Sequence, residues 1–153
     1  NVNVHWRNWD TATDEGSSLF ATQEFLKHHP VVDIVALIQC TSPFLRKEYL
    51  EQARRTIEKF ECVFSVTRSF ELLWRRANGT LCPLNFDLKN RPRRQDLPEQ
   101  FVENGMFYFA SRKMIENGQF QSNSCAIVEI PRYNSMEIDD PLDLIVANMN
   151  IDE

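Results

Sequence analysis

The sequence predicts an α/β fold with helices on both faces of a parallel sheet. Two segments with helical spacing of apolar residues, 17–29 and 46–60, alternate with two apolar, strand-like segments, 33–39 and 62–67. Such alternation is typical of parallel sheets covered by helices. A chain of 153 residues is expected to form one domain.

The helices are predicted from apolar residues that fall on one side of each segment. Residues 17–29 carry this pattern at Leu19, Phe20, Phe25 and Leu26. Residues 46–60 follow Pro43 and carry apolar or small side chains at positions 50, 53, 57 and 60. A last helix is expected to begin after Asp140, with Asp140 as N-cap and Pro141 at the first helical position.

The strands are predicted from short apolar runs. Asp33–Gln39 is nearly continuous in apolar residues, which indicates a parallel strand covered on both faces. Cys62–Thr67 is similar, Phe101–Ala110 is rich in aromatic residues, and Ala126–Ile130 leads into Pro131. These four runs are the expected strands of the sheet.

The pattern breaks between residues 68 and 100. Asn78-Gly79 is a turn signal, and apolar residues lie on both sides of it, at Leu72, Leu73, Trp74 and Leu81. We interpret 68–100 as a hairpin-like insertion that leaves the sheet and returns. Apolar side chains on a projection need a cover, and a partner subunit is the usual one.

Charge and hydropathy exclude two classes of partner. The formal net charge is −5, so the chain lacks the basic surface of a nucleic-acid-binding protein. The longest apolar run, Val31–Ile38, is interrupted by Asp33 and is too short to span a membrane. One local exception is 90–96, where three arginines in four positions present planar donor forks suited to carboxylate or phosphate. A solvated loop or an import signal is the alternative for that segment.

The cysteines and histidines predict no metal centre. Cysteines at 40, 62, 82 and 125 have no C-x-x-C spacing, and no paired histidines complete a zinc site. We expect Cys40 and Cys62 to be buried as small hydrophobic residues. The compartment stays open, because the sequon Asn78-Gly79-Thr80 suits a Golgi or other secretory lumen and the basic cluster Arg91, Arg93 and Arg94 suits a nucleus.

Two groups of polar residues are candidates for chemistry. Gln39, Thr41 and Ser42 lie at the carboxyl end of a predicted strand, where α/β sheets bind ligands, although Ser42 could instead cap the next helix. Glu137 and Asp139 project to the same side of an extended backbone and could together hold Mg²⁺ against substrate phosphates. The alternative is that the pair belongs to a solvated turn, as most isolated acidic pairs with this spacing do.

Four motifs in a fixed order carry a family resemblance. They are Ile38-Gln39-x-Thr41-Ser42-Pro43, Arg91-Pro92-Arg93-Arg94-Gln95-Asp96, Glu103-Asn104-Gly105-x-Phe107-Tyr108 and Ile138-Asp139. Over nearly its whole length the chain resembles the CMP-sialic acid synthetases (N-acylneuraminate cytidylyltransferases) of the animal type. The resemblance implies a Rossmann-like nucleotidyltransferase fold, of the nucleotide-diphospho-sugar transferase type, with a projecting dimerisation hairpin. Residues 1–153 would be part of one cytidylyltransferase domain, 68–100 its dimerisation insertion, and the assembly a homodimer or homotetramer.

The family activity is the transfer of CMP from CTP to sialic acid. The anomeric hydroxyl of the sugar attacks the α-phosphorus and pyrophosphate leaves, with Mg²⁺ assisting. By resemblance, Arg94 and Asp139 are the catalytic residues, and Asp139 holds the metal together with Glu137, which stands where many relatives carry aspartate. The substrate-binding residues implied in the same way are Gln39, Thr41, Ser42, Arg91, Gln95, Asn104 and Tyr108.

The family pattern also begins with a glycine- and lysine-containing loop that cradles the triphosphate, and this chain contains no counterpart. Val4-His5-x-Arg7 matches a later part of the pattern. We therefore expect a fragment that is inactive alone and that leaves a sheet edge exposed. The alternatives are a cytidylyltransferase for another acidic keto sugar, and a non-catalytic oligomerisation or regulatory form that keeps the dimer element.

Overall fold

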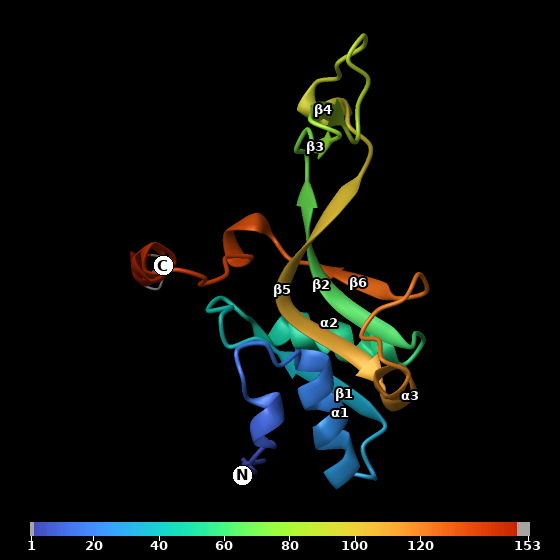
Figure 1. Ribbon diagram of the computed structural model, residues 1–153, viewed down its shortest axis with the longest axis vertical. Coiled ribbons are helices and arrows are strands. Elements are labelled where there is room, and N and C mark those ends of the chain that lie inside the picture. Colours follow the sequence, from blue (N-terminus) through green and yellow to red (C-terminus); the bar gives the residue numbers. More distant parts are fainter. Residues whose placement is uncertain (1, 150–153) are drawn as a thin grey trace.

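A computed structural model describes residues 2–149, which form a four-stranded sheet flanked by helices and a long projecting arm (Figure 1). The strands lie in the order β1 (Ile34–Ile38), β5 (Gln100–Ser111), β2 (Cys62–Ser69) and β6 (Ala126–Glu129). β2 and β6 are parallel, and β5 runs antiparallel to both β1 and β2. The α/β class is confirmed, but the expected all-parallel sheet is wrong at β5. The reason is that the chain leaves the sheet at the end of β2 and returns from that same end.

Two helices lie where apolar spacing predicts them, a third lies where the Asp140-Pro141 signal predicts it, and a short fourth helix was not expected. The α-helices are α1 (Ser18–His28), α2 (Lys47–Ile57), α3 (Arg112–Glu116) and α4 (Pro141–Met149), and the short 3-10 turns are η1 (Trp9–Thr11), η2 (Arg94–Asp96) and η3 (Arg132–Asn134). Asp140 caps α4 as predicted, because its Oδ1 accepts the backbone N–H groups of Leu142 and Asp143 at 2.7 and 3.0 Å. No helix within residues 2–149 is long and apolar enough to cross a membrane.

Alternate residues of β5 divide the interior into two cores, one on each face of the sheet. Phe107 and Phe109 pack with Val63 and the apolar side of α2. Ala110 packs on the opposite face with Leu26 of α1 and with the apolar residues of α3. Figure 1 shows α1 and α2 on opposite faces of the sheet accordingly.

β1 is less covered than its apolar composition predicts. Val35 packs into the core beneath α1, but Ile34 and Ile38 on the other side of the strand are 47% and 44% exposed. β1 is also an edge strand, paired with β5 alone among the described strands. The prediction of a strand covered on both faces is therefore wrong within residues 2–149.

Residues 70–99, which we call the arm, project from the sheet between β2 and β5 (Figure 1). β3 (Trp74–Ala77) and β4 (Thr80–Pro83) form a hairpin in the arm. Its turn lies at Asn78 and Gly79, with φ of 50° and 79°, as a tight hairpin turn requires. The turn signal in the sequence is confirmed.

The predictions that Cys40 and Cys62 are buried have different outcomes. Cys62 is buried as expected, but it is joined by a disulfide to Cys125 across 63 residues of sequence. Cys40 is exposed, because it lies just beyond the end of β1 rather than inside the strand. Sequence spacing alone does not reveal the disulfide, since β2 and the segment before β6 become neighbours only in the folded sheet.

Candidate functional site

Three segments far apart in sequence are joined at the carboxyl end of β1. The backbone N–H of Gln39 donates to the carbonyl of Met106 at 3.1 Å, and that of Ile138 donates to the carbonyl of Thr41 at 2.9 Å. The Thr41 hydroxyl donates to Glu137 Oε1 at 3.1 Å. The first, third and fourth sequence motifs therefore meet where α/β sheets bind their ligands.

Gly105 allows Glu137 to approach β5. Its φ is +70°, and a Cβ built there would lie 2.8 Å from Glu137 Oε1. Glycine adopts this φ without the steric cost that other residues meet, and it also leaves room for the carboxylate. The glycine of the Glu103-Asn104-Gly105 motif is thus required by the position of Glu137.

A pocket of about 390 Å³ lies at the carboxyl ends of β2 and β6. It is lined by charged and hydroxyl-bearing side chains together with one amide and two apolar side chains: Thr67, Arg68, Ser69, Glu71, Val102, Glu103, Asn104, Arg132, Ser135, Met136 and Glu137. Within it, Arg68 donates two hydrogen bonds, of 2.9 and 2.7 Å, to the carboxylate of Glu129. These bonds lower the pKa of Glu129 and hold the guanidinium in a fixed plane.

A second pocket, of about 250 Å³, contains Gln39 and Tyr108 together with Gln121. The Tyr108 hydroxyl donates to Glu103 Oε2 at 3.2 Å, which connects this pocket with the larger one. Partial burial, and then the nearby Glu103 carboxylate, raise the pKa of Tyr108 to about 12. The phenol is therefore a neutral donor at physiological pH. Gln121 Nε2 is buried here without a hydrogen-bond partner among residues 2–149, so it remains free to donate.

Ser42 and Asn104 differ from their expected surroundings. Ser42 does not cap α2, because Arg46 occupies the N-cap position; its Oγ is buried and has no partner within the described residues. Asn104 is buried, and its Nδ2 donates to Thr67 and Ser135 at 3.2 and 3.1 Å. Its amide therefore fixes the wall of the pocket.

Glu137 and Asp139 are the residues of this site that could hold a divalent cation together with oxygens from a substrate. Asp139 is exposed and its carboxylate accepts no hydrogen bond from residues 2–149, whereas Glu137 is held by Thr41. Asp140 is a poorer ligand, because its carboxylate already caps α4. Oxygen donors of this kind suit Mg²⁺, which usually takes one or two carboxylates and fills its remaining positions with water and phosphate.

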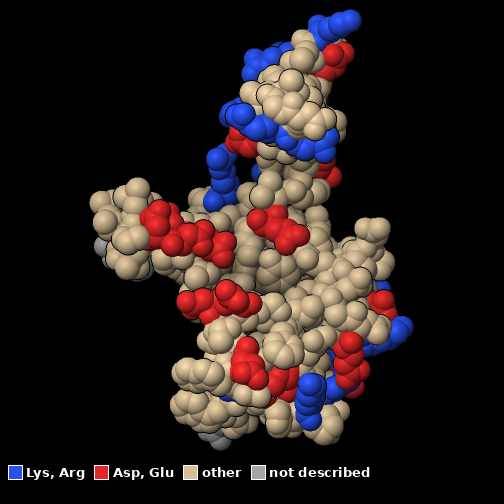
Figure 2. All heavy atoms as spheres, in the orientation of Figure 1, with Lys and Arg blue, Asp and Glu red and all other residues tan. Residues whose placement is uncertain are grey.

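The arginine motif lies on the arm. Arg94 and Gln95 are exposed, and Arg94 contacts Glu71 of the larger pocket at 3.3 Å. Arg91 is exposed and makes no ion pair or hydrogen bond within residues 2–149. Figure 2 shows Lys and Arg gathered on the arm and Asp and Glu spread over this face of the body. The structure thus brings the other three motifs together but leaves Arg91 and Gln95 apart from them.

Four charged residues of the larger pocket were not among the predicted site residues. They are Arg68, Glu71, Arg132 and Glu103, the last of which belongs to the third motif. Arg68 lies near the end of β2 and Arg132 just after β6, so the rule that ligands bind at carboxyl ends of strands would have indicated both. Glu71 carries no comparable signal, because it lies in the arm beyond the end of the strand.

The fold is that of Rossmann-like nucleotidyltransferases. The chain is similar to the crystal structure of 4-diphosphocytidyl-2C-methyl-D-erythritol synthase from Anaerococcus prevotii, with a TM-score of 0.66 and 16% sequence identity. The match covers 90% of this chain and 67% of that one. At this level of identity the comparison establishes the fold.

Sequence comparison with curated proteins extends the result from the fold to the family. The chain is 36% identical to N-acylneuraminate cytidylyltransferase B of Danio rerio and 40% identical to N-acylneuraminate cytidylyltransferase of Oncorhynchus mykiss, in each case over 97% of its length. The N-acylneuraminate cytidylyltransferase of Escherichia coli O18:K1:H7 is 28% identical over 90% of this chain. The chain is therefore homologous to the N-acylneuraminate cytidylyltransferases, which confirms the resemblance. It spans only 36% and 35% of the two fish proteins, and no protein-family model matches it.

Replacing Gly105 tests the packing of Glu137 against β5. We expect Gly105→Ala to lower the free energy of unfolding by about 1–3 kcal/mol, because the new Cβ is strained at positive φ and also meets the carboxylate. Gly118→Ala is the matched control, since Gly118 has φ of +82° but open space around its Cβ. Urea unfolding of both variants measures the difference. Equal losses would show that the approach of Glu137 adds nothing.

Proposed function

We propose that the protein containing this chain is an N-acylneuraminate cytidylyltransferase, which converts CTP and sialic acid to CMP-sialic acid and pyrophosphate. The observation that carries the proposal is the junction of three motif segments at the end of β1, through Gln39, Thr41 and Ile138. This junction brings an amide, a hydroxyl and carboxylates to two adjoining pockets. The homology supplies the identity of the substrates.

The proposed reaction needs positioning and charge neutralisation rather than a protein nucleophile. The anomeric hydroxyl of the sugar forms a bond to the α-phosphorus of CTP, the bond to pyrophosphate breaks, and the hydroxyl proton is released. Gln39 and the neutral phenol of Tyr108 line the smaller pocket, which suits a polyhydroxylated sugar. We assign that pocket to sialic acid, with Gln121 Nε2 as a further donor.

The proposed cofactor is Mg²⁺, held by Asp139 with Glu137 beside it. When bound, the ion would neutralise phosphate charge and orient the triphosphate. Thr41 and Gly105 position Glu137, by a hydrogen bond and by leaving space for the carboxylate. The segment from 136 to 139 leads directly into the capped start of α4, and the Asp139 N–H donates to Asp143 Oδ2 at 3.0 Å, which limits the movement of Asp139.

The arm supports a dimeric assembly. It carries six basic and four acidic residues, whereas the chain as a whole has a net charge of −5. Its exposed apolar side chains include Trp74, Leu81 and Leu88, at 48%, 60% and 61% exposure. We propose that the arms pair across a dimer, which would cover these side chains and could bring Arg91 and Gln95 beside the body of the second subunit.

We further propose a secretory lumen as the compartment. The disulfide between Cys62 and Cys125 is of the kind that persists in an oxidising environment. The sequon residue Asn78 lies in the exposed turn between β3 and β4, outside the hydrophobic core, so its side chain is accessible for glycosylation. The arginine cluster then serves anion binding rather than nuclear import.

Substitutions at Asp139 and Asp140 distinguish a metal ligand from a helix cap. In the complete protein, Asp139→Asn should abolish turnover and leave the fold intact, because it removes the charge that holds Mg²⁺. Asp140→Asn should retain most activity, because asparagine also caps helices. Pyrophosphate release and circular dichroism report the two effects. If Asp140→Asn is equally inactive or worse, the choice of ligand is wrong.

Substitutions at Arg94 and Arg93 distinguish recognition of a substrate anion from stabilisation of the arm. Arg94→Lys should lower kcat/KM for sialic acid at least about tenfold, because lysine cannot form a bidentate fork. Arg93→Lys is the control, since Arg93 already pairs with Asp96 inside the arm at 2.7 Å. Its effect should be smaller. Steady-state kinetics of the complete protein with sialic acid varied decide this, and wild-type kinetics in Arg94→Lys would refute the assignment.

The dimer is tested through the apolar side chains of the arm. Sedimentation of the purified protein should show a dimer or a larger even-numbered species, and Leu81→Glu with Leu88→Glu should shift it toward monomer. Val31→Glu is the control, because Val31 is 89% exposed but lies outside the arm. A wild-type monomer at micromolar concentration would contradict the proposal.

A further inference from the structure

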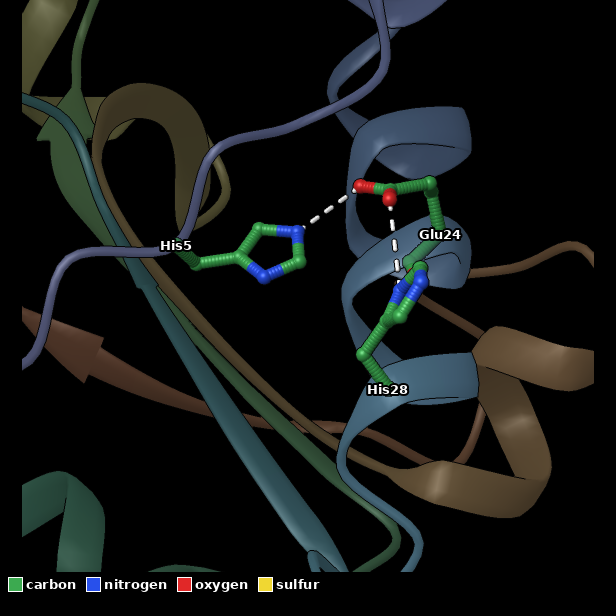
Figure 3. A group of neighbouring side chains, drawn as sticks. All are labelled: His5, Glu24 and His28. Carbon is green, nitrogen blue, oxygen red and sulfur yellow. Dashed lines mark hydrogen bonds and ion pairs between the residues drawn. The ribbon is translucent and has the colours of Figure 1, made fainter.

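A cluster of ligating side chains lies away from both pockets, where the N-terminal segment crosses α1. His5, Glu24 and His28 point toward one another there (Figure 3). His5 Nε2 is 2.9 Å from Glu24 Oε2, and His28 Nδ1 is 3.3 Å from Glu24 Oε1. One ligating atom from each residue lies within 4.8 Å of the others.

We propose that His5, Glu24 and His28 form a binding site for a zinc-class divalent cation. Two imidazoles and one carboxylate are a ligand set that Zn²⁺ accepts, with water in the fourth position. The ion would bind the N-terminal segment to α1. This inference concerns a site separate from the proposed cytidylyltransferase site and does not depend on it.

The spacing of the side chains agrees with such an ion. A tetrahedral ion with bonds of about 2.0–2.2 Å separates its neighbouring ligand atoms by about 3.4 Å, and two bound imidazole rings by roughly 5 Å between centres. The two nitrogen–oxygen distances are 2.9 and 3.3 Å, and the ring centres of His5 and His28 are 5.5 Å apart. Small side-chain movements would therefore complete the coordination.

The backbone presents the ligands without rearrangement. Glu24 and His28 are four residues apart on α1, so they share one face of the helix. His5 comes from the N-terminal segment, whose neighbours Val4 and Trp6 are 73% and 89% exposed while the His5 side chain is 23% exposed. His5 is thus the residue of this stretch that turns toward the helix.

Hydrogen bonds link all three residues: His5 Nε2 bonds Glu24 Oε2 at 2.9 Å, and His28 Nδ1 lies 3.1 Å from the backbone carbonyl of Glu24, a contact that a bound ion would replace. Each oxygen of the Glu24 carboxylate faces a different histidine, and within residues 2–149 no lysine or arginine pairs with it. The carboxylate is 12% exposed, whereas His28 is 62% exposed and offers a route for an ion from solvent.

The test is zinc binding to the untagged protein in a Cys40→Ser, Cys82→Ser background, which removes the free thiols as competing ligands. After EDTA treatment and its removal, calorimetric titration with ZnSO₄ should give one ion per chain. His5→Gln, Glu24→Gln and His28→Gln should each weaken binding at least about tenfold. Zinc should raise the midpoint of thermal unfolding in the parent but much less in these variants.

His29→Gln is the matched control. His29 lies beside the cluster, with its ring centre 5.5 Å from that of His5, but it stacks on Phe25 at 4.1 Å and is not one of the three ligands. Its replacement should change zinc affinity less than about twofold, because a residue outside the ligand set adds little. An equal loss in His29→Gln and His28→Gln would overturn the assignment.

Cobalt provides a measurement that does not depend on the folding of any variant. The parent protein with one equivalent of CoCl₂ should develop the visible absorption of a four-coordinate site with nitrogen and oxygen ligands. Absence of saturable zinc binding in the parent would overturn the proposal. So would an unchanged affinity in all three ligand variants with native circular dichroism.

Discussion

The position of β5 is the constraint on which the rest of the structure depends. It pairs on one side with β1 and on the other with β2, and its alternate residues build the core on each face. Its first residue directly follows the arm, and Gly105 leaves room for Glu137 beside the pocket. A slip of one residue in the register of β5 would exchange Phe107 and Tyr108 between faces, and would damage the core and the binding pocket together.

The sequence predicts the elements of this chain better than their arrangement. Periodicity identifies α1 and α2, and the Asp140-Pro141 signature identifies the start of α4, because these features are local. The antiparallel direction of β5 and the disulfide of Cys62 are not local, since both depend on which end of β2 the chain returns to. The exposure of Ile34 and Ile38 was missed because apolar composition indicates what a strand can bury, whereas its neighbours decide what it does bury.

The candidate site shows the same difference between features that are local in sequence and features that depend on the tertiary structure. Gln39, just beyond the end of β1, and Tyr108, within β5, were predicted from their motifs and share a pocket. Asn104 belongs to the same motif, but its buried amide is used in bonds to Thr67 and Ser135, which residue type alone does not indicate. The cluster of His5 with Glu24 was also invisible to spacing rules, because its members come together only when the N-terminal segment packs on α1. Motif order thus finds a family, while tertiary contacts decide which motif atoms remain free.

The disulfide closes a covalent ring that contains the whole arm. Cys62 begins β2 and Cys125 immediately precedes β6, so both legs of the arm, with β5 and α3, lie in the loop between them. In the chain-entropy account a loop of this length favours the folded state by about 4 kcal/mol. A second consequence is topological: a protease that cuts the exposed arm once opens the ring without separating the two halves of the sheet. The body could then keep its architecture as a nicked, two-segment molecule for as long as its surroundings leave the disulfide oxidised.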